Sequence, residues 1–159
     1  PALEFWLMGG FFTADWSKVA GIIPSLLVGS SVILLLRWKV NILSLGEEEA
    51  LALGIRVSLV RCLLVGAAAV LVAAVVSVAG MVSWIGLVAP HVVRFMAGNN
   101  HVRTLPLSIS IGGGMLLAAD TIARTATTSE IPISIVTSFV GAPFLGYLLI
   151  KVGNEYWNR

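Results

Sequence analysis

One uncharged run constrains this chain more than any other feature. Residues Cys62 to Val93 contain no Asp, Glu, Lys or Arg over 32 consecutive positions. A soluble domain rarely buries so long an uncharged stretch. Only 11% of the 159 residues are charged, against about 25% in soluble domains. We therefore expect an integral membrane protein surrounded by a lipid bilayer.

Four uncharged runs indicate where the chain crosses the membrane. A helical span needs about 20 apolar residues, so three of the runs suit one span each. The 32-residue run is too long for one span and slightly short for two. The runs are Val19–Leu36, Cys62–Val93, Thr104–Ala119 and Ile131–Ile150.

The basic residues decide how many spans the long run holds. The segment before it carries Arg37, Lys39, Arg56 and Arg61, and the segment after it runs from Arg94 to Arg103. Cytoplasmic loops are rich in Lys and Arg, so both segments are expected on the cytoplasmic side. That placement requires two spans between them, and Gly80 is the natural break.

An all-α polytopic transmembrane bundle with a cytoplasmic C-terminus follows. Eight of the ten basic residues then lie inside, and Lys18 and Arg124 lie outside. Because the chain starts without Met or a basic leader, we expect a piece of a longer membrane protein, with residues 3–12 ending an earlier helix. The five complete helices are expected at about Lys18–Arg37, Ser58–Ala79, Gly80–Ala97, Leu105–Ala123 and Ile133–Val152.

The inner connection 44–56 has the pattern of a short helix. Ser44 is expected to cap it, and three glutamates, 47–49, fall in its first turn, where the helix dipole favours them. Gly54 suits its C-terminal stop. This helix is either a solvated connector or a docking element for a cytoplasmic partner, and both interpretations stay open on chemistry alone.

Two further groups of polar residues need an explanation. Asp120 and Arg124 are four residues apart on one expected helix face, which predicts an ion pair. Arg94 follows Pro90 by one turn and would satisfy freed backbone carbonyls or bind lipid headgroups. His91 has no second ligand at metal-binding spacing, so we expect a structural role and no metal site.

Small residues and a proline complete the local signals. The patches 112–114 and 66–69 are rich in Gly and Ala and are expected to pack against neighbouring helices. Gly141 and Pro143 interrupt the last expected helix, which predicts a kink there.

Ordered motifs make the chain resemble a known family. It is similar to permeases of the iron-siderophore, haem and cobalamin ABC importers (FecCD-type, type II importers). The resemblance covers essentially all 159 residues, and Ser134 stands where the family usually has glycine. The stretches that carry it are Leu45-Gly46-Glu47 with Ala50 and Leu53-Gly54, Gly86 to Arg94, Ala118 to Arg124, and Glu130 to Thr137 with Gly141-Ala142-Pro143-Phe144.

The resemblance implies roles for individual residues. Residues 1–159 would form the C-terminal half of one permease domain, about spans six to ten of ten. The inner connection would dock a separate ATPase through Leu45, Gly46, Glu47, Glu48, Ala50 and Gly54. Arg124, framed by Glu130, would pair with a carboxylate of an extracytoplasmic substrate-binding protein. The remaining motif residues would be structural: Gly86, Pro90, His91, Arg94, Asp120, Gly141 and Pro143.

The resemblance also implies partners and a location. A second copy of the permease would complete the pore, and ATP and Mg would bind the ATPase subunit. The membrane would be the cytoplasmic (inner) membrane of a bacterium or archaeon. Iron-siderophore, haem, cobalamin or a related chelate would be the cargo, without a motif that chooses among them.

Several other classes of function fit the sequence less well. The chain lacks a phosphate-binding P-loop, a serine nucleophile elbow and an H-E-x-x-H motif, so we do not expect an enzyme. Its net charge of +2 does not suggest nucleic-acid binding. An ion-coupled secondary transporter is the alternative, but it requires intramembrane carboxylates, and Asp120 is the candidate. A structural assembly subunit would not explain the ordered motifs.

Overall fold

The computed structural model describes residues 6–11, 14–125 and 131–157 of the chain, and these residues form helices and their connections without a strand. The expected all-α bundle is confirmed. A helical turn at 6–8 precedes the named helices. These are α2 (Trp16–Leu43), α3 (Glu47–Ala52), α4 (Val57–Ala79), α5 (Ile85–Ala97), α6 (His101–Thr125) and α7 (Ile133–Trp157).

Three helices, α2, α4 and α6, are long and apolar enough to cross a membrane. The returning helix α5 has only 13 residues, which rise about 20 Å, less than the ~30 Å hydrocarbon core. Helix α7 has 25 residues, of which Ile133–Leu148 form its apolar part. The predicted break at Gly80 is confirmed. The span after it is shorter than expected because residues 80–84 are not helical.

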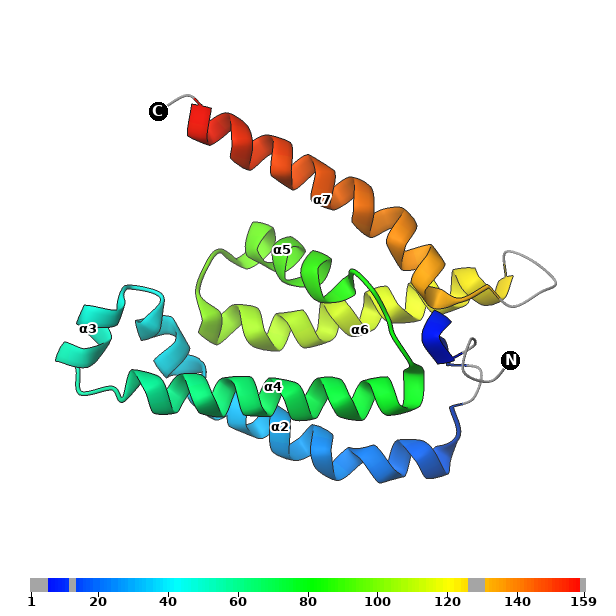
Figure 1. Ribbon diagram of the computed structural model, residues 1–159, viewed down its shortest axis with the longest axis horizontal. Coiled ribbons are helices and arrows are strands. Elements are labelled where there is room, and N and C mark those ends of the chain that lie inside the picture. The colour runs from blue at the N-terminus through cyan, green and yellow to red at the C-terminus, as the bar shows by residue number, and fades with distance from the viewer. Residues whose placement is uncertain (1–5, 12–13, 126–130, 158–159) are drawn as a thin grey trace.

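The 32-residue uncharged run forms two helices, α4 and α5. The chain leaves one end of the bundle along α4 and returns to the same end along α5. Figure 1 shows α3 and the α5–α6 connection at one end of the bundle. The α4–α5 connection and the N-terminal turn lie at the other end. We call these the coupling end and the outer end, after the roles and sides that the sequence analysis expects for them. Both Lys/Arg-rich connections therefore lie at the coupling end, as the charge pattern predicted, whereas Lys18 and Arg124 belong to the outer end.

Small residues set the closest approaches between helices. Helix α2 packs along α4, α5 packs along α6, and α7 contacts α5 and α6. A Cβ on Gly29 would come within 2.6 Å of Leu71 Cγ, so this glycine lets α2 approach α4. Ala67, from one predicted patch, is buried at the same place. In the other patch Gly112 lies near Ala89, whereas no described atom lies within 4 Å of a Cβ on Gly113 or Gly114.

A small apolar cluster closes the outer end. Ala119, Ala123 and Ile133 are buried together, and Ile133 is fully buried. Phe11 and Val82 pack against them. The cluster joins the end of α6, the start of α7, the α4–α5 connection and the N-terminal segment, which are distant in sequence.

Candidate functional site: the coupling end and the outer ion pair

Helix α3 begins at a glycine and ends at a glycine. Gly46 is its N-cap with φ +151°, a conformation that L side chains rarely adopt. The three glutamates occupy the first turn, as predicted. After Ala52, the Gly54 N–H donates to the Leu51 carbonyl, and the Ile55 N–H donates to the Ala50 carbonyl. Gly54 has φ +74°, so this is a Schellman stop and the predicted terminator is confirmed.

The expected cap at Ser44 is wrong. Helix α2 runs to Leu43, six residues beyond the predicted end, and Ser44 is its C-cap. The Ser44 hydroxyl donates to the Asn41 carbonyl at 2.6 Å, and α3 has no side-chain cap at its own start. The prediction failed because the charged residues 37 and 39 do not end α2, which continues beyond the apolar segment.

One side of α3 packs against the bundle. Ala50 is fully buried, and Val57 and Val60 of α4 are also buried at this end. Arg61 of α4 forms an ion pair with Glu47 at 2.9 Å. Both side chains of that pair are more than half exposed, so it orients α3 without adding much stability.

Apolar side chains are exposed on α3 and on the residues that flank it. Leu45, Leu51 and Leu53 are 71%, 57% and 65% exposed, and Glu48 and Glu49 beside them are exposed as well. These five residues form what we call the α3 surface. Because these leucines are exposed, they do not contribute to a buried core. Such a surface is typical of a protein-interaction site.

A second link at the coupling end joins α2 to α6. The His101 N–H, at the start of α6, donates to Asn41 Oδ1 at 3.2 Å. The bond supplies an acceptor for one of the unpaired N–H groups at a helix start. Sequence analysis missed both this link and Arg61–Glu47, since each pairs residues from different helices. A polar Asn41 just after an apolar run was the available signal.

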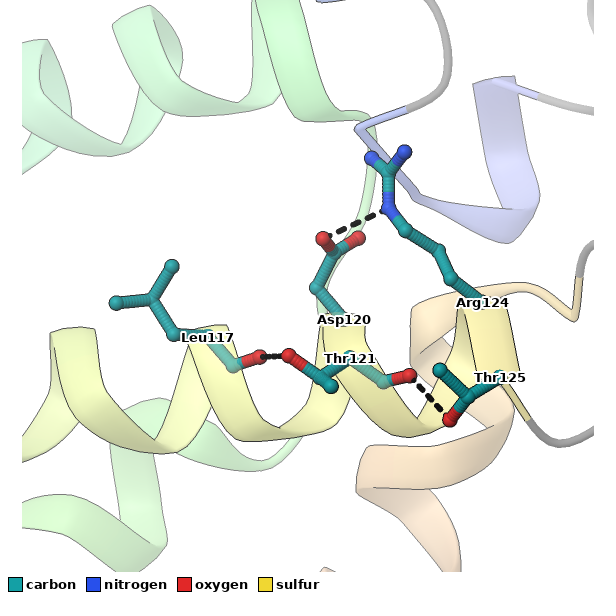
Figure 2. Close-up of polar contacts among 5 residues, drawn as sticks. All are labelled: Leu117, Asp120, Thr121, Arg124 and Thr125. Carbon is teal, nitrogen blue, oxygen red and sulfur yellow. Dashed lines mark hydrogen bonds and ion pairs between the residues drawn. The ribbon is translucent and has the colours of Figure 1, made fainter.

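The predicted ion pair near the outer end of α6 is confirmed. Arg124 Nε donates to Asp120 Oδ2 at 2.8 Å, one helical turn apart. Figure 2 shows the two side chains meeting on one side of α6, while the Thr121 and Thr125 hydroxyls bond to backbone carbonyls of α6 itself. Arg124 is 46% exposed. Glu130, expected to frame this site, lies outside the described residues.

The motif from Gly86 to Arg94 lies in α5 and meets α7. His91 Nδ1 lies 2.7 Å from the Leu87 carbonyl, and its ring meets Phe144 of α7 edge-on at 6.1 Å between centroids. These contacts support the structural role predicted for His91. Arg94 is exposed in the last turn of α5. No three His, Cys, Asp or Glu residues cluster for a metal in the part of the chain that the structure describes.

A backbone seam at the outer end depends on two glycines. The Gly10 N–H donates to the Ala79 carbonyl at 2.8 Å, and the Ile133 N–H donates to the Gly9 carbonyl at 3.2 Å. Gly80 has φ +67°, and a Cβ there would overlap the Trp6 carbonyl. A Cβ on Gly9, which has φ +66°, would overlap the Met81 carbonyl. The seam joins the N-terminal segment to α4 and α7 at a distance that only glycine permits.

Long apolar helices and basic residues gathered at one end define a polytopic membrane protein. The chain belongs to the FecCD transport family, whose model matches residues 1–151. It is 41% identical over 152 residues to the molybdate import system permease protein MolB of Haemophilus influenzae. That match covers 96% of this chain and 45% of MolB.

Two more matches agree. Identity to the cobalamin import system permease protein BtuC of Halobacterium salinarum is 44%, over 94% of this chain and 40% of the relative. A solved metal-chelate type ABC transporter in an inward-facing conformation superposes with TM-score 0.89 at 41% identity, covering 95% of this chain and 49% of that one. The chain thus spans about half the length of the relatives it matches.

Proposed function

We propose that this chain is part of the membrane-spanning permease subunit of a binding-protein-dependent ABC importer. The cargo class is an iron-siderophore, haem, cobalamin or a related metal chelate. The chain would be the C-terminal half of the permease domain, and a second permease copy would complete the translocation path. The family match over residues 1–151 supports this proposal. Basic residues at the coupling end support a cytoplasmic location for that end in a bacterial or archaeal inner membrane.

The α3 surface is the observation that carries the proposal. It combines three exposed leucines with two exposed glutamates on α3 and the residues that flank it, at one end of the bundle. Elsewhere on the same helix, Ala50 is fully buried and Glu47 pairs with Arg61 of α4. A partner that binds the α3 surface would therefore transmit force to the transmembrane helices. We infer that this partner is a separate ATPase subunit, which binds ATP and Mg and performs the hydrolysis.

Arg124 at the outer end suits the other partner. A guanidinium carries several N–H donors in a planar fork that matches carboxylates. Arg124 is half exposed and uses Nε for Asp120, so Asp120 orients it. We infer that an acidic residue of an extracytoplasmic substrate-binding protein contacts Arg124.

The ion-coupled secondary transporter gains no support. That mechanism needs a carboxylate free to exchange a cation, and Asp120 is held by Arg124 at 2.8 Å. Transport without catalysis in this chain agrees with the relatives, which are permease proteins by name.

Co-purification tests the ATPase contact. In the full-length permease, Glu48→Lys reverses a charge on the α3 surface without touching the bundle, and we expect at least a tenfold loss of ATPase subunit recovered with the permease. Asn99→Asp is the control, because it also changes charge at an exposed position of the coupling end outside α3. Normal ATPase recovery and stimulation in Glu48→Lys would refute the proposed contact.

A charge swap tests the outer contact. Arg124→Glu should weaken binding-protein affinity about tenfold, but it also places two carboxylates together. The double variant Asp120→Arg with Arg124→Glu restores the ion pair and moves the positive charge by one turn. We expect affinity to stay low in the double variant. Recovery of full affinity there would mean that Arg124 matters only as a partner of Asp120.

A further inference from the structure

The connection between α4 and α5 contains an unusual backbone conformation. Among the non-glycine residues that the structure describes, Trp84 alone has a positive φ, +69°. That region is unfavourable for a bulky side chain. Trp84 nevertheless begins α5, because its carbonyl accepts the N–H groups of Leu87 and Val88 at 2.9 and 3.0 Å. The surrounding structure must therefore hold this tryptophan in place.

The Trp84 side chain packs against Gly141 of α7. A Cβ on Gly141 would overlap Cβ and Cγ of Trp84. Gly141 is buried and has no positive φ, so the space of its missing side chain matters here and not its backbone freedom. A second contact, His91 against Phe144, lies farther along the same two helices. Together the two contacts join α5 to α7.

Two hollows border the Trp84–Gly141 contact. One is an apolar cavity of about 190 Å³ between α5, α6 and α7, which both residues line. The other is a larger, open hollow of about 770 Å³, lined by Met81 and Ser83 of the connection and by Ala142 and Pro143 of α7. The α4–α5 connection and α7 thus contribute residues to both hollows. A shift of either element changes both hollows.

We propose that Trp84 is a positioning residue that fixes α7 to α5, so that the two helices move as one unit during transport. The inference rests on the proposed permease function, but the contact itself is independent of it. Trp84 need not touch the cargo. Its side chain fills the space beside Gly141.

A matched pair of glycine substitutions tests this contact. The full-length permease is assembled with its ATPase, with Cys62→Ala as background and His91→Cys with Phe144→Cys as a cross-link reporter of the α5–α7 contact. Gly141→Ala should lower the cross-link yield and the transport rate at least tenfold. Gly146→Ala makes the same change in α7, where no described atom lies within 4 Å of the new Cβ, and should leave the cross-link yield unchanged. Transport is measured with the native His91 and Phe144 in place.

A second substitution guards against simple misfolding. Trp84→Gly removes the overlapping side chain and suits a positive φ, so this variant should fold but cross-link and transport less. Combined with Gly141→Ala, it should cross-link better than Gly141→Ala alone, because the new methyl group no longer overlaps the Trp84 side chain. The inference is overturned if Gly141→Ala behaves like Gly146→Ala, if Trp84→Gly changes nothing, or if the double variant is no better than Gly141→Ala. The cross-link yield does not depend on transport. If the proposed permease function is wrong but the Trp84–Gly141 inference is right, the expected differences in cross-link yield among these variants remain.

Discussion

The two ends of the bundle are held together by different kinds of contact. At the outer end, backbone meets backbone: Gly9 and Gly80 admit carbonyl groups where a side chain would collide, and a buried apolar cluster lies at the same end. At the coupling end, α3 is attached by one buried alanine and an exposed ion pair. Stability differs accordingly across a structure. The outer end is fixed by packing, whereas α3 can be displaced at low cost, which suits an element that responds to a partner.

Gly80→Ala should have the largest effect on stability. The new Cβ overlaps the Trp6 carbonyl at φ +67°, so we expect a loss of about 3 kcal/mol from steric overlap plus backbone strain. Thermal unfolding of the purified permease in detergent measures it. Gly98→Ala is the control, since Gly98 has φ +73° but no described atom within 4 Å of its Cβ. Gly98→Ala should lower the free energy of unfolding by about 1 kcal/mol. Equal losses in the two variants would mean that close backbone contact at Gly80 does not stabilise the outer end.

Ala50→Leu should have an intermediate and local effect. Ala50 is fully buried between α3 and the bundle, so three added carbons should cost about 1–3 kcal/mol and push α3 away. Faster amide hydrogen exchange in residues 47–55, without faster exchange in α4, would report this. Ala52→Leu, at an exposed position of the same helix, should exchange like the parent. Equal exchange in both variants would mean that Ala50 does not attach α3.

Arg61→Gln should have a small effect on stability. The pair with Glu47 is mostly exposed, and such pairs contribute at most about 1 kcal/mol, less at high salt. Exchange in residues 47–52 should rise slightly at low salt. The swapped double variant Glu47→Arg with Arg61→Glu should restore slow exchange. A swap that behaves like the single variant would show that the pair does not orient α3.

Asp15 should give the smallest effect, and one that depends on pH. Its carboxylate accepts the N–H groups of Lys18 and Ser17 at the start of α2, and these bonds lower the pKa of Asp15 below 3.8. The capping contribution is therefore complete above that value and is lost as pH falls through the lowered pKa. Hydrogen exchange at residues 17–18 should rise below pH 3.8. Asp15→Asn keeps a cap and should remove this pH dependence; an unchanged pH profile would contradict it.

Sequence patterns predicted the features that depend on nearby residues. The breaks at Gly80 and Gly54, the glutamates of α3 and the Asp120–Arg124 pair are all local, and the structure contains them. Charge placement also predicted which connections share an end, because basic residues sort to one side of a membrane. Helix α7 continues through Pro143. A continuous helix can still bend, so the kink expected there stays a prediction.

The features that the sequence did not predict join distant residues. Trp84 with Gly141, Asn41 with His101 and Gly9 with Met81 depend on how helices meet, which a hydropathy pattern does not contain. The misplaced cap at Ser44 has a local cause: α2 continues past its charged residues instead of ending at the apolar boundary. Hydropathy marks where a helix leaves lipid, not where the helix ends.

Site-directed cross-linking between α3 and the ATPase tests the central claim most directly. In the full-length permease with Cys62→Ala, Leu51→Cys places a thiol on the α3 surface, and a short cysteine-to-lysine cross-linker is added to the assembled complex. We predict a permease–ATPase product from Leu51→Cys and none from Asn99→Cys, which is exposed at the same end but outside α3. A product from both positions, or from neither, would contradict the assignment of α3 as the ATPase contact.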